Sequence, residues 1–154
     1  MKAIDIPVVS APSTPQGLSG NASILLHEIA DRVRRLIEVG ETSAIDLLAM
    51  PLNAADLEWL RRQLGEGEIR ISLEADGPST IHETQCPAVW WITHHNAGGG
   101  VLSAFIEVTT VPEIVKAPME DVRCGLNRLE ELIADARSGA PIEIEQKQEE
   151  PNHA

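Results

Sequence analysis

The stretch EIRISLEADGPSTIHETQCPAVWWITHHNAGGGVLSAFIEV, residues 68–108, decides the fold through the spacing of its hydrophobic side chains. Ile69, Ile71 and Leu73 alternate with charged and polar residues. Successive side chains of a strand point to opposite faces, so a period of two predicts a strand with one buried face.

Turn signals divide the rest of this stretch into further strands. Asp76-Gly77 is typical of a hairpin, and three consecutive glycines at 98–100 require a second turn. We therefore expect three more strands, over residues 80–84, 89–95 and 101–108. Four sequential strands with short connections predict an antiparallel β-meander.

Helical periods flank the strands on both sides. Residues 21–39 repeat apolar side chains at the spacing of one helix face. Asn53 is suited to cap a second helix, with Asp56 in its first turn, where the helix dipole favours an acid. A third helix is expected to begin at Pro118 and to end before Gly139.

Together these elements predict an α+β fold. A four-stranded antiparallel β-meander is expected to be covered mainly on one face by two N-terminal helices and one C-terminal helix. Residues 43–48 are either a short strand or an extended connector. We assign residues 21–139 to a single domain, with a flexible N-terminal arm over 1–20 and a disordered acidic tail over 140–154.

Composition limits the partners of the chain. Acidic residues outnumber basic ones 24 to 12, giving a formal net charge of -12, which disfavours binding to nucleic acid or to an anionic membrane surface. The apolar stretches are too short to span a membrane, and the N-terminus lacks the pattern of a signal peptide. Two cysteines are too few for a disulfide scaffold. We therefore expect a cytoplasmic protein.

The consecutive tryptophans Trp90 and Trp91 lie in an expected strand, so one is predicted to face the core and the other to face outward. An outward tryptophan is a common binding hot spot. The alternative is that the outward ring packs under a loop or under the N-terminal arm.

Cys86 and the histidines raise two chemical hypotheses. Cys86, His82 and His94 could converge across neighbouring strands into a metal or iron–sulfur carrier site. Cys86 could also serve as the nucleophile of a small thiol-dependent enzyme, although no glycine-rich oxyanion turn accompanies it. Buried or half-buried thiols and surface histidines are the simpler interpretation, and we expect neither a bound cofactor nor catalysis.

Two motifs carry a family resemblance. LGEGEI at 64–69 and IHETQCPAVW at 81–90 resemble L-G-E-G-E-V and I-x-E-T-x-x-x-G-V-W of the HupH/HyaF hydrogenase expression proteins, in their conserved C-terminal region. The resemblance covers roughly residues 46–136. The longer family members carry this region twice, whereas one copy is present here. Ala88 stands at a family glycine, and Trp91 stands where a charged residue is common.

The resemblance implies an accessory role in the maturation of nickel–iron hydrogenases. The leading hypothesis is a chaperone that holds the iron–sulfur small subunit precursor before it joins the large subunit. Other maturation proteins are further expected partners, and an open sheet edge or an outward tryptophan could support a homodimer. The motifs point to six residues that build the recognition surface or, alternatively, determine the fold: Gly65, Glu66, Gly67, Glu83, Thr84 and Trp90.

Overall fold

The computed structural model describes residues 17–75 and 77–139. Residues 1–16 of the expected arm and the expected acidic tail at 140–154 lie outside the described residues. The chain divides into two compact units, Met1–Glu113 and Ile114–Ala154, and each is described by itself.

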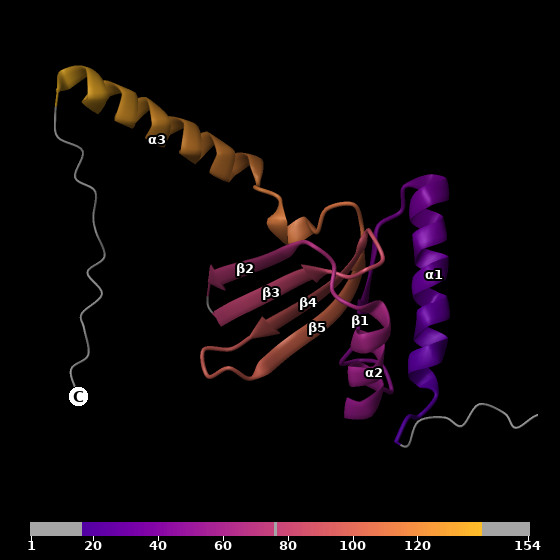
Figure 1. Cartoon of the computed structure of the whole chain (residues 1–154). Helices are drawn as coiled ribbons and strands as arrows, with labels where there is room; N and C mark the ends of the chain where they lie inside the picture. Colours follow the sequence, from indigo (N-terminus) through magenta and orange to yellow (C-terminus); the bar gives the residue numbers. More distant parts are fainter. Residues whose placement is uncertain (1–16, 76, 140–154) are drawn as a thin grey trace, which may run out of the picture. The chain divides into compact units, whose positions relative to one another are not determined.

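The first unit contains one antiparallel sheet in the order β1-β5-β4-β3-β2 (Figure 1). The expected meander is confirmed as four sequential strands, β2 (Arg70–Ala75), β3 (Gly77–Glu83), β4 (Val89–His95) and β5 (Val101–Val108).

The expected strand number was wrong, because the sheet has five strands rather than four. The additional strand is β1 (Ser43–Asp46), which lies between the two N-terminal helices in sequence and pairs with β5. Ile45 is opposite Ile106 in this pairing, and both are buried. Four residues are too short to show a period, so the sequence left this segment open between a strand and a connector.

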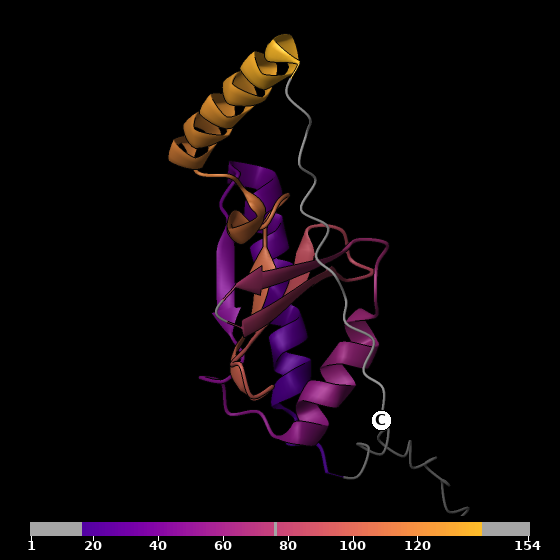
Figure 2. The ribbon, with the colours of Figure 1, turned by 90° about the vertical axis from the view of Figure 1, so that its left-hand side faces the viewer.

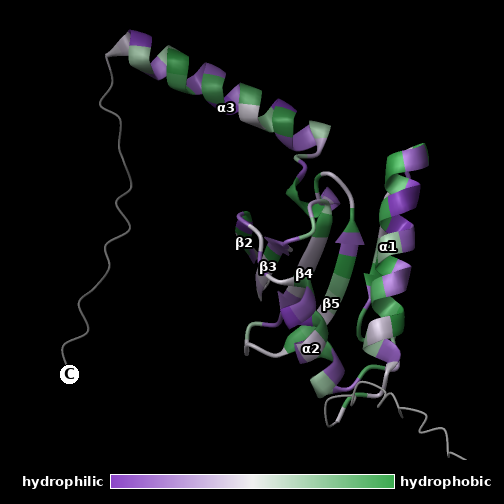
Figure 3. Cartoon of the chain, turned by 45° about the vertical axis from the view of Figure 1, so that its right-hand side comes forward, coloured by the Kyte–Doolittle hydropathy of each residue, from purple (hydrophilic) through white to green (hydrophobic). Residues whose placement is uncertain are grey.

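Helices α1 (Asn21–Val39) and α2 (Ala54–Leu64) lie on the same face of this sheet (Figures 1 and 2). Their apolar sides meet the sheet residues that point toward them. Along α1, hydrophobic and hydrophilic residues alternate in bands, as an amphipathic helix requires (Figure 3). The main core is almost entirely aliphatic and contains Leu25, Ile29, Ile45, Leu47, Leu60, Leu64, Val89, Trp91, Ala104, Ile106 and Val108.

The opposite face of the sheet carries a second, smaller apolar cluster. Ile81, Trp90 and Ile92 are its buried members. Trp90 and Trp91 point to opposite faces as expected, but the expected outward ring is also buried, since their exposed fractions are 4% and 6%. The Trp90 ring packs at the segment after β5, where its Nε1–H donates to the carbonyl oxygen of Thr109. The alternative of a ring covered by a loop is therefore confirmed.

The start of α2 anchors the last residues of the expected arm. Asn53 and Asp56 form a reciprocal capping box, as the sequence indicated. The Asp56 carboxylate is fully buried and also accepts hydrogen bonds from the Ser19 hydroxyl at 2.6 Å and from the Ser19 backbone at 3.0 Å. These hydrogen bonds, the one from the Ser19 hydroxyl above all, lower the pKa of Asp56 below its ordinary value.

The second unit contains the expected third helix. A 3-10 turn, Glu113–Val115, precedes α3 (Met119–Ser138), which starts after Pro118 and ends at Gly139 as predicted. The packing of this helix on the sheet and the single domain over 21–139 stay predictions. Of the helices in the described residues, none combines the length and the apolar character that a membrane crossing requires.

Candidate functional site

Two loops that carry the sequence motifs meet at one end of the sheet. The first, residues 65–69, joins α2 to β2, and the second, residues 84–88, joins β3 to β4. We call this region the two-loop junction. Its loops are tied by backbone hydrogen bonds from Gly67 to Glu83 at 2.7 Å, from Glu83 to Ile69 at 2.9 Å and from Gln85 to Leu64 at 2.9 Å. The two sequence motifs, which are separated along the chain, are therefore in direct contact in the structure.

Both glycines of the first loop are required by this close approach. A Cβ at Gly67 would lie 2.5 Å from the Thr84 carbonyl oxygen, which is backbone and cannot move alone. Gly65 has a φ of +64°, and a Cβ there would meet the Gln85 side chain at 2.5 Å. These two motif positions serve the fold directly.

The second loop is shaped by Thr84 and Ala88. Thr84 is buried, and its hydroxyl both accepts from the Cys86 backbone N–H and donates to the Cys86 carbonyl, each at 3.1 Å. Ala88 has a φ of +68°, in the left-handed region that favours glycine. Glycine would adopt this backbone conformation at a lower cost than alanine does.

A shallow groove of about 460 Å³ opens beside the two-loop junction. Three of its lining residues are glutamates, Glu66, Glu68 and Glu83. Glu66 pairs with Arg70 at 2.7 Å, but both side chains are more than half exposed, so solvent screens the pair. Glu83 forms no ion pair in the described part of the chain. The groove therefore presents negative charge, and its shape and polarity suit a basic segment better than an apolar one.

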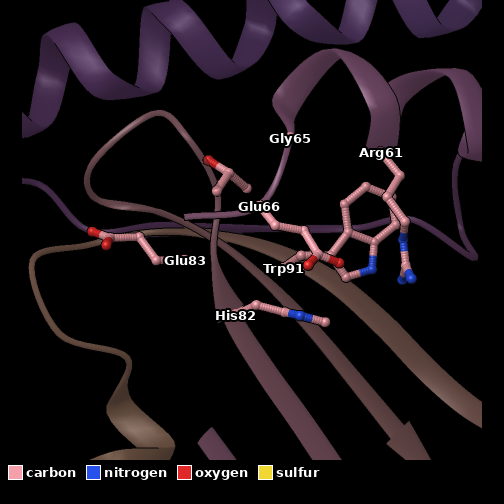
Figure 4. A pocket seen from close by; sticks show the side chains of 7 residues that line it. Arg61, Gly65, Glu66, His82, Glu83 and Trp91 are labelled. Atoms are coloured by element: carbon pink, nitrogen blue, oxygen red, sulfur yellow. The ribbon is translucent and has the colours of Figure 1, made fainter. Parts of the chain in front are cut away.

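A much smaller pocket, with a volume of about 10 Å³, shares Glu66, Glu83 and Thr84 with the groove among its lining residues. Trp91, His82 and Arg61 line it, and the Arg61 guanidinium lies 4.7 Å from the centre of the Trp91 ring (Figure 4). Glu83 points away from this group (Figure 4). Burial lowers the pKa of His82, and the positive charges of Arg70 and Arg61 act in the same direction against an opposing effect of Glu66. His82 is therefore neutral at pH 7.

The structure does not bring Cys86, His82 and His94 together, as the alternative hypothesis of a metal carrier site would require. His82 lies opposite Trp91 in the sheet and His94 lies opposite Ser79, which places the two imidazoles on opposite faces. The His94 ring is hydrogen-bonded to the Ser79 hydroxyl at 2.8 Å, and Cys86 is exposed in its loop. Within residues 17–75 and 77–139, no three His, Cys, Asp or Glu side chains are grouped to hold a metal ion.

The structure brings five of the six motif residues together at the two-loop junction. Trp90 is nearby, opposite Glu83 in the sheet, but its ring is buried on the second face. Sequence reasoning did not identify Arg61 as part of this surface. Arg61 lies near the end of α2 and stacks on Trp91 of β4, about 30 positions later in the sequence. The periodicity of hydrophobic residues does not predict a contact of this kind.

Comparison with protein families gives a match to the HupH hydrogenase expression protein, C-terminal conserved region, over residues 20–136. The chain is 32% identical over 117 residues to the hydrogenase expression/formation protein HupH of Rhodobacter capsulatus, covering 76% of this chain and 42% of that protein. It is 31% identical over 121 residues to the hydrogenase-1 operon protein HyaF of Escherichia coli (strain K12), covering 79% and 42%. The chain thus spans about two-fifths of the length of these curated relatives.

A solved structure shares this fold. The hydrogenase expression protein HupH from Thiobacillus denitrificans ATCC 25259 superposes with a TM-score of 0.74 at 52% sequence identity. The match covers 77% of this chain and 98% of that chain. This agreement confirms the expected family resemblance, and with it the α+β architecture of the described residues.

Proposed function

The chain belongs to the HupH hydrogenase expression protein family, and we propose that it acts in hydrogenase maturation as a non-enzymatic chaperone for the iron–sulfur small subunit precursor. The names of its relatives, hydrogenase expression/formation proteins, support a role in making the hydrogenase. The chaperone would hold the precursor before the large subunit docks.

The acidic groove at the two-loop junction is the observation that carries this proposal. It is built by both family motifs, and it places Glu66, Glu68 and Glu83 around one open surface. Such a surface attracts a basic segment of a partner and speeds its association. No covalent step is needed for a holding role of this kind.

The six motif residues divide into two roles in this proposal. Glu66 and Glu83 are proposed to contact the client, because both residues line the groove. Gly65, Gly67 and Thr84 shape the loops, and the buried Trp90 fixes the strand beneath them. Fold determinants and recognition residues then sit in the same motifs because the loops must be tightly folded to present the carboxylates.

The cytoplasm is the proposed site of action. Cys86 and Cys124 are both exposed free thiols, which favours a reducing compartment. Other maturation proteins are proposed to meet the same client, and a homodimer of this chain remains a further proposal.

An anaerobic binding assay with purified small subunit precursor tests the function. The wild-type chain is expected to bind, and Glu83→Gln or Glu66→Gln is expected to weaken binding roughly fivefold each, equivalent to about 1 kcal/mol per charge. Binding should also weaken as salt is raised, since exposed charges are screened.

Glu38→Gln is the matched control, because it makes the same chemical change on α1, at an exposed position outside the groove. It should leave binding unchanged. No association of the wild-type chain with the precursor would overturn the proposed function. Equal losses for Glu38→Gln and Glu83→Gln would overturn the assignment of the groove.

A further inference from the structure

Helix α3 carries a row of apolar side chains that is uncovered within the described residues of the second unit. Leu126 and Leu129, in the middle of the row, are 55% and 58% exposed. Hydrophobic and hydrophilic bands alternate along the helix (Figure 3). A helix with one apolar side normally buries that side against another element. The six residues of the row are Met119, Val122, Leu126, Leu129, Ile133 and Ala136.

The spacing of this row is that of a coiled coil. Its members follow one another at intervals of 3, 4, 3, 4 and 3 residues, which is the alternation of the a and d positions of a heptad. A strict repeat of this kind gives a narrow seam, whereas a helix that covers a globular core generally has a wider apolar stripe. The e positions along one edge of the row are all charged, namely Arg123, Glu130 and Arg137. The row therefore fits one partner helix.

The charged edge indicates that this partner helix is a second α3 that runs in the opposite direction. In an antiparallel pair of heptad helices, e positions face e positions. With Leu126 placed beside Leu129 of the other copy, each apolar residue of the row meets an apolar residue. Arg123 then lies opposite Glu130 of the other copy, and two-fold symmetry forms this ion pair twice. Neither residue forms an ion pair in the described part of its own chain.

Gly125 in the interior of α3 is explained by the same arrangement. Glycine destabilises a helix interior relative to alanine. A Cβ at Gly125 would meet nothing within 4 Å in the described chain, so packing within one copy does not require glycine there. In the antiparallel pair, g positions also face each other, which places Leu132 of one copy against Gly125 of the other. The missing side chain leaves room for the leucine.

We propose that two copies of this chain associate through α3 as an antiparallel two-helix coiled coil. A second copy is favoured over a different protein, because the complementary charges and the pair of Leu132 and Gly125 lie on one sequence. This inference goes beyond the proposed function and does not rest on it. The dimer would carry the acidic groove twice, and could therefore hold two clients.

Sedimentation equilibrium of the full chain in reducing buffer tests the dimer. Salt at about 0.15 M screens the repulsion between two copies that each carry a formal net charge of -12. We expect the mass to rise from one chain to two with concentration. Leu129→Gln should weaken the association by more than about tenfold, since the dimer loses a buried leucine twice. Ala134→Gln is the matched control, because it introduces the same residue at an exposed position outside the row.

Charge reversal tests the direction of the helices. Arg123→Glu and Glu130→Arg should each weaken the association about fivefold, because like charges then meet twice in the dimer. The double variant should restore the association, since opposite charges face each other again. In a parallel pair, e positions face g positions, and Glu130 would face Gly125, so no restoration is expected there. Circular dichroism checks that each variant keeps its helices.

Three results would each overturn the proposal. The first is the mass of a single chain at every concentration up to about 1 mM. The second is an equal loss for Leu129→Gln and Ala134→Gln, and the third is no restoration by the double charge reversal. A monomeric chain in which Leu129→Gln lowers stability would show that α3 packs within its own chain instead. Client binding by such a monomer would reject the dimer and leave the proposed function standing.

Discussion

The indole nitrogen of Trp90 donates a hydrogen bond of 2.9 Å to the carbonyl oxygen of Thr109, across 19 positions of sequence. The neighbouring Trp91 forms no equivalent bond in the described chain. Trp90→Phe should therefore cost roughly 1–3 kcal/mol more stability than Trp91→Phe, because it leaves a buried carbonyl without its donor. Denaturant unfolding of both variants measures the difference.

Both substitutions shrink the same kind of ring in a buried site, so the pair cancels most of the packing loss. Equal destabilisation by the two variants would mean that the Trp90 bond contributes nothing beyond packing. It would also weaken the view that this residue of the motif serves the fold.

Gly67→Ala should destabilise the protein by roughly 1–3 kcal/mol, the usual cost of overpacking. The new Cβ would lie 2.5 Å from the Thr84 oxygen and 3.0 Å from the Glu83 oxygen, and both are backbone atoms. The exposed neighbour Glu68→Ala should change stability by less than about 0.5 kcal/mol. Thermal melts of the two variants provide the comparison, and a Gly67→Ala variant as stable as the wild type contradicts the close approach of the loops.

Ala88→Gly should stabilise the protein by up to about 1 kcal/mol. A left-handed backbone costs an alanine roughly 1–2 kcal/mol, and glycine removes this cost. Part of the gain is lost, because glycine also increases the conformational entropy of the unfolded chain. Ala30→Gly, at an exposed position within α1, should instead cost about 0.5–1 kcal/mol. Opposite signs of the two alanine-to-glycine changes in chemical denaturation are the expected result. A loss at both positions would argue against the left-handed conformation of Ala88.

Asp56 should make stability depend on pH in the acid range. Its pKa is lowered in the folded protein, chiefly by the Ser19 hydroxyl, so its contribution is present above the ordinary value of 3.8 and is lost as pH falls through the folded value. Asp56→Asn should therefore be less stable than the wild type at neutral pH, with a gap that narrows on acidification. Ser19→Ala removes the hydrogen bond that lowers the Asp56 pKa most. In a Ser19→Ala background, the difference in stability between the protein with Asp56 and its Asp56→Asn variant should therefore begin to narrow at a higher pH than in the wild-type background. A gap that stays constant down to strong acid would contradict this account.

The sequence predicted the meander and the helices because each has its own period and its own stop signals. Alternation at Ile69, Ile71 and Leu73 and the capping pair of Asn53 and Asp56 are local features. The sequence did not decide whether residues 43–46 form a strand, because four residues are too few to show a period. They form a strand only because they pair with β5.

The candidate site was predictable in part for a related reason. Tight loops need particular residues at particular positions, so Gly65, Gly67 and Thr84 stand out in the sequence. Arg61 and Trp91 meet only because α2 ends above β4, and that relationship depends on the packed core rather than on spacing. The burial of Trp90 on the second face likewise involves a distant segment, since its indole N–H donates to the carbonyl oxygen of Thr109.

The pairing of β1 with β5 has a consequence for how the chain folds during synthesis. Ile45 leaves the ribosome about 60 residues before its partner Ile106, a delay of roughly 3–12 s at typical rates of translation. The meander from β2 to β5 closes through short loops, whereas β1 must close one long loop, so it is expected to join last. Until β5 has been synthesised, the apolar side of α1 has no sheet to pack against and β1 has no partner strand. These two elements are therefore expected to expose apolar side chains during synthesis.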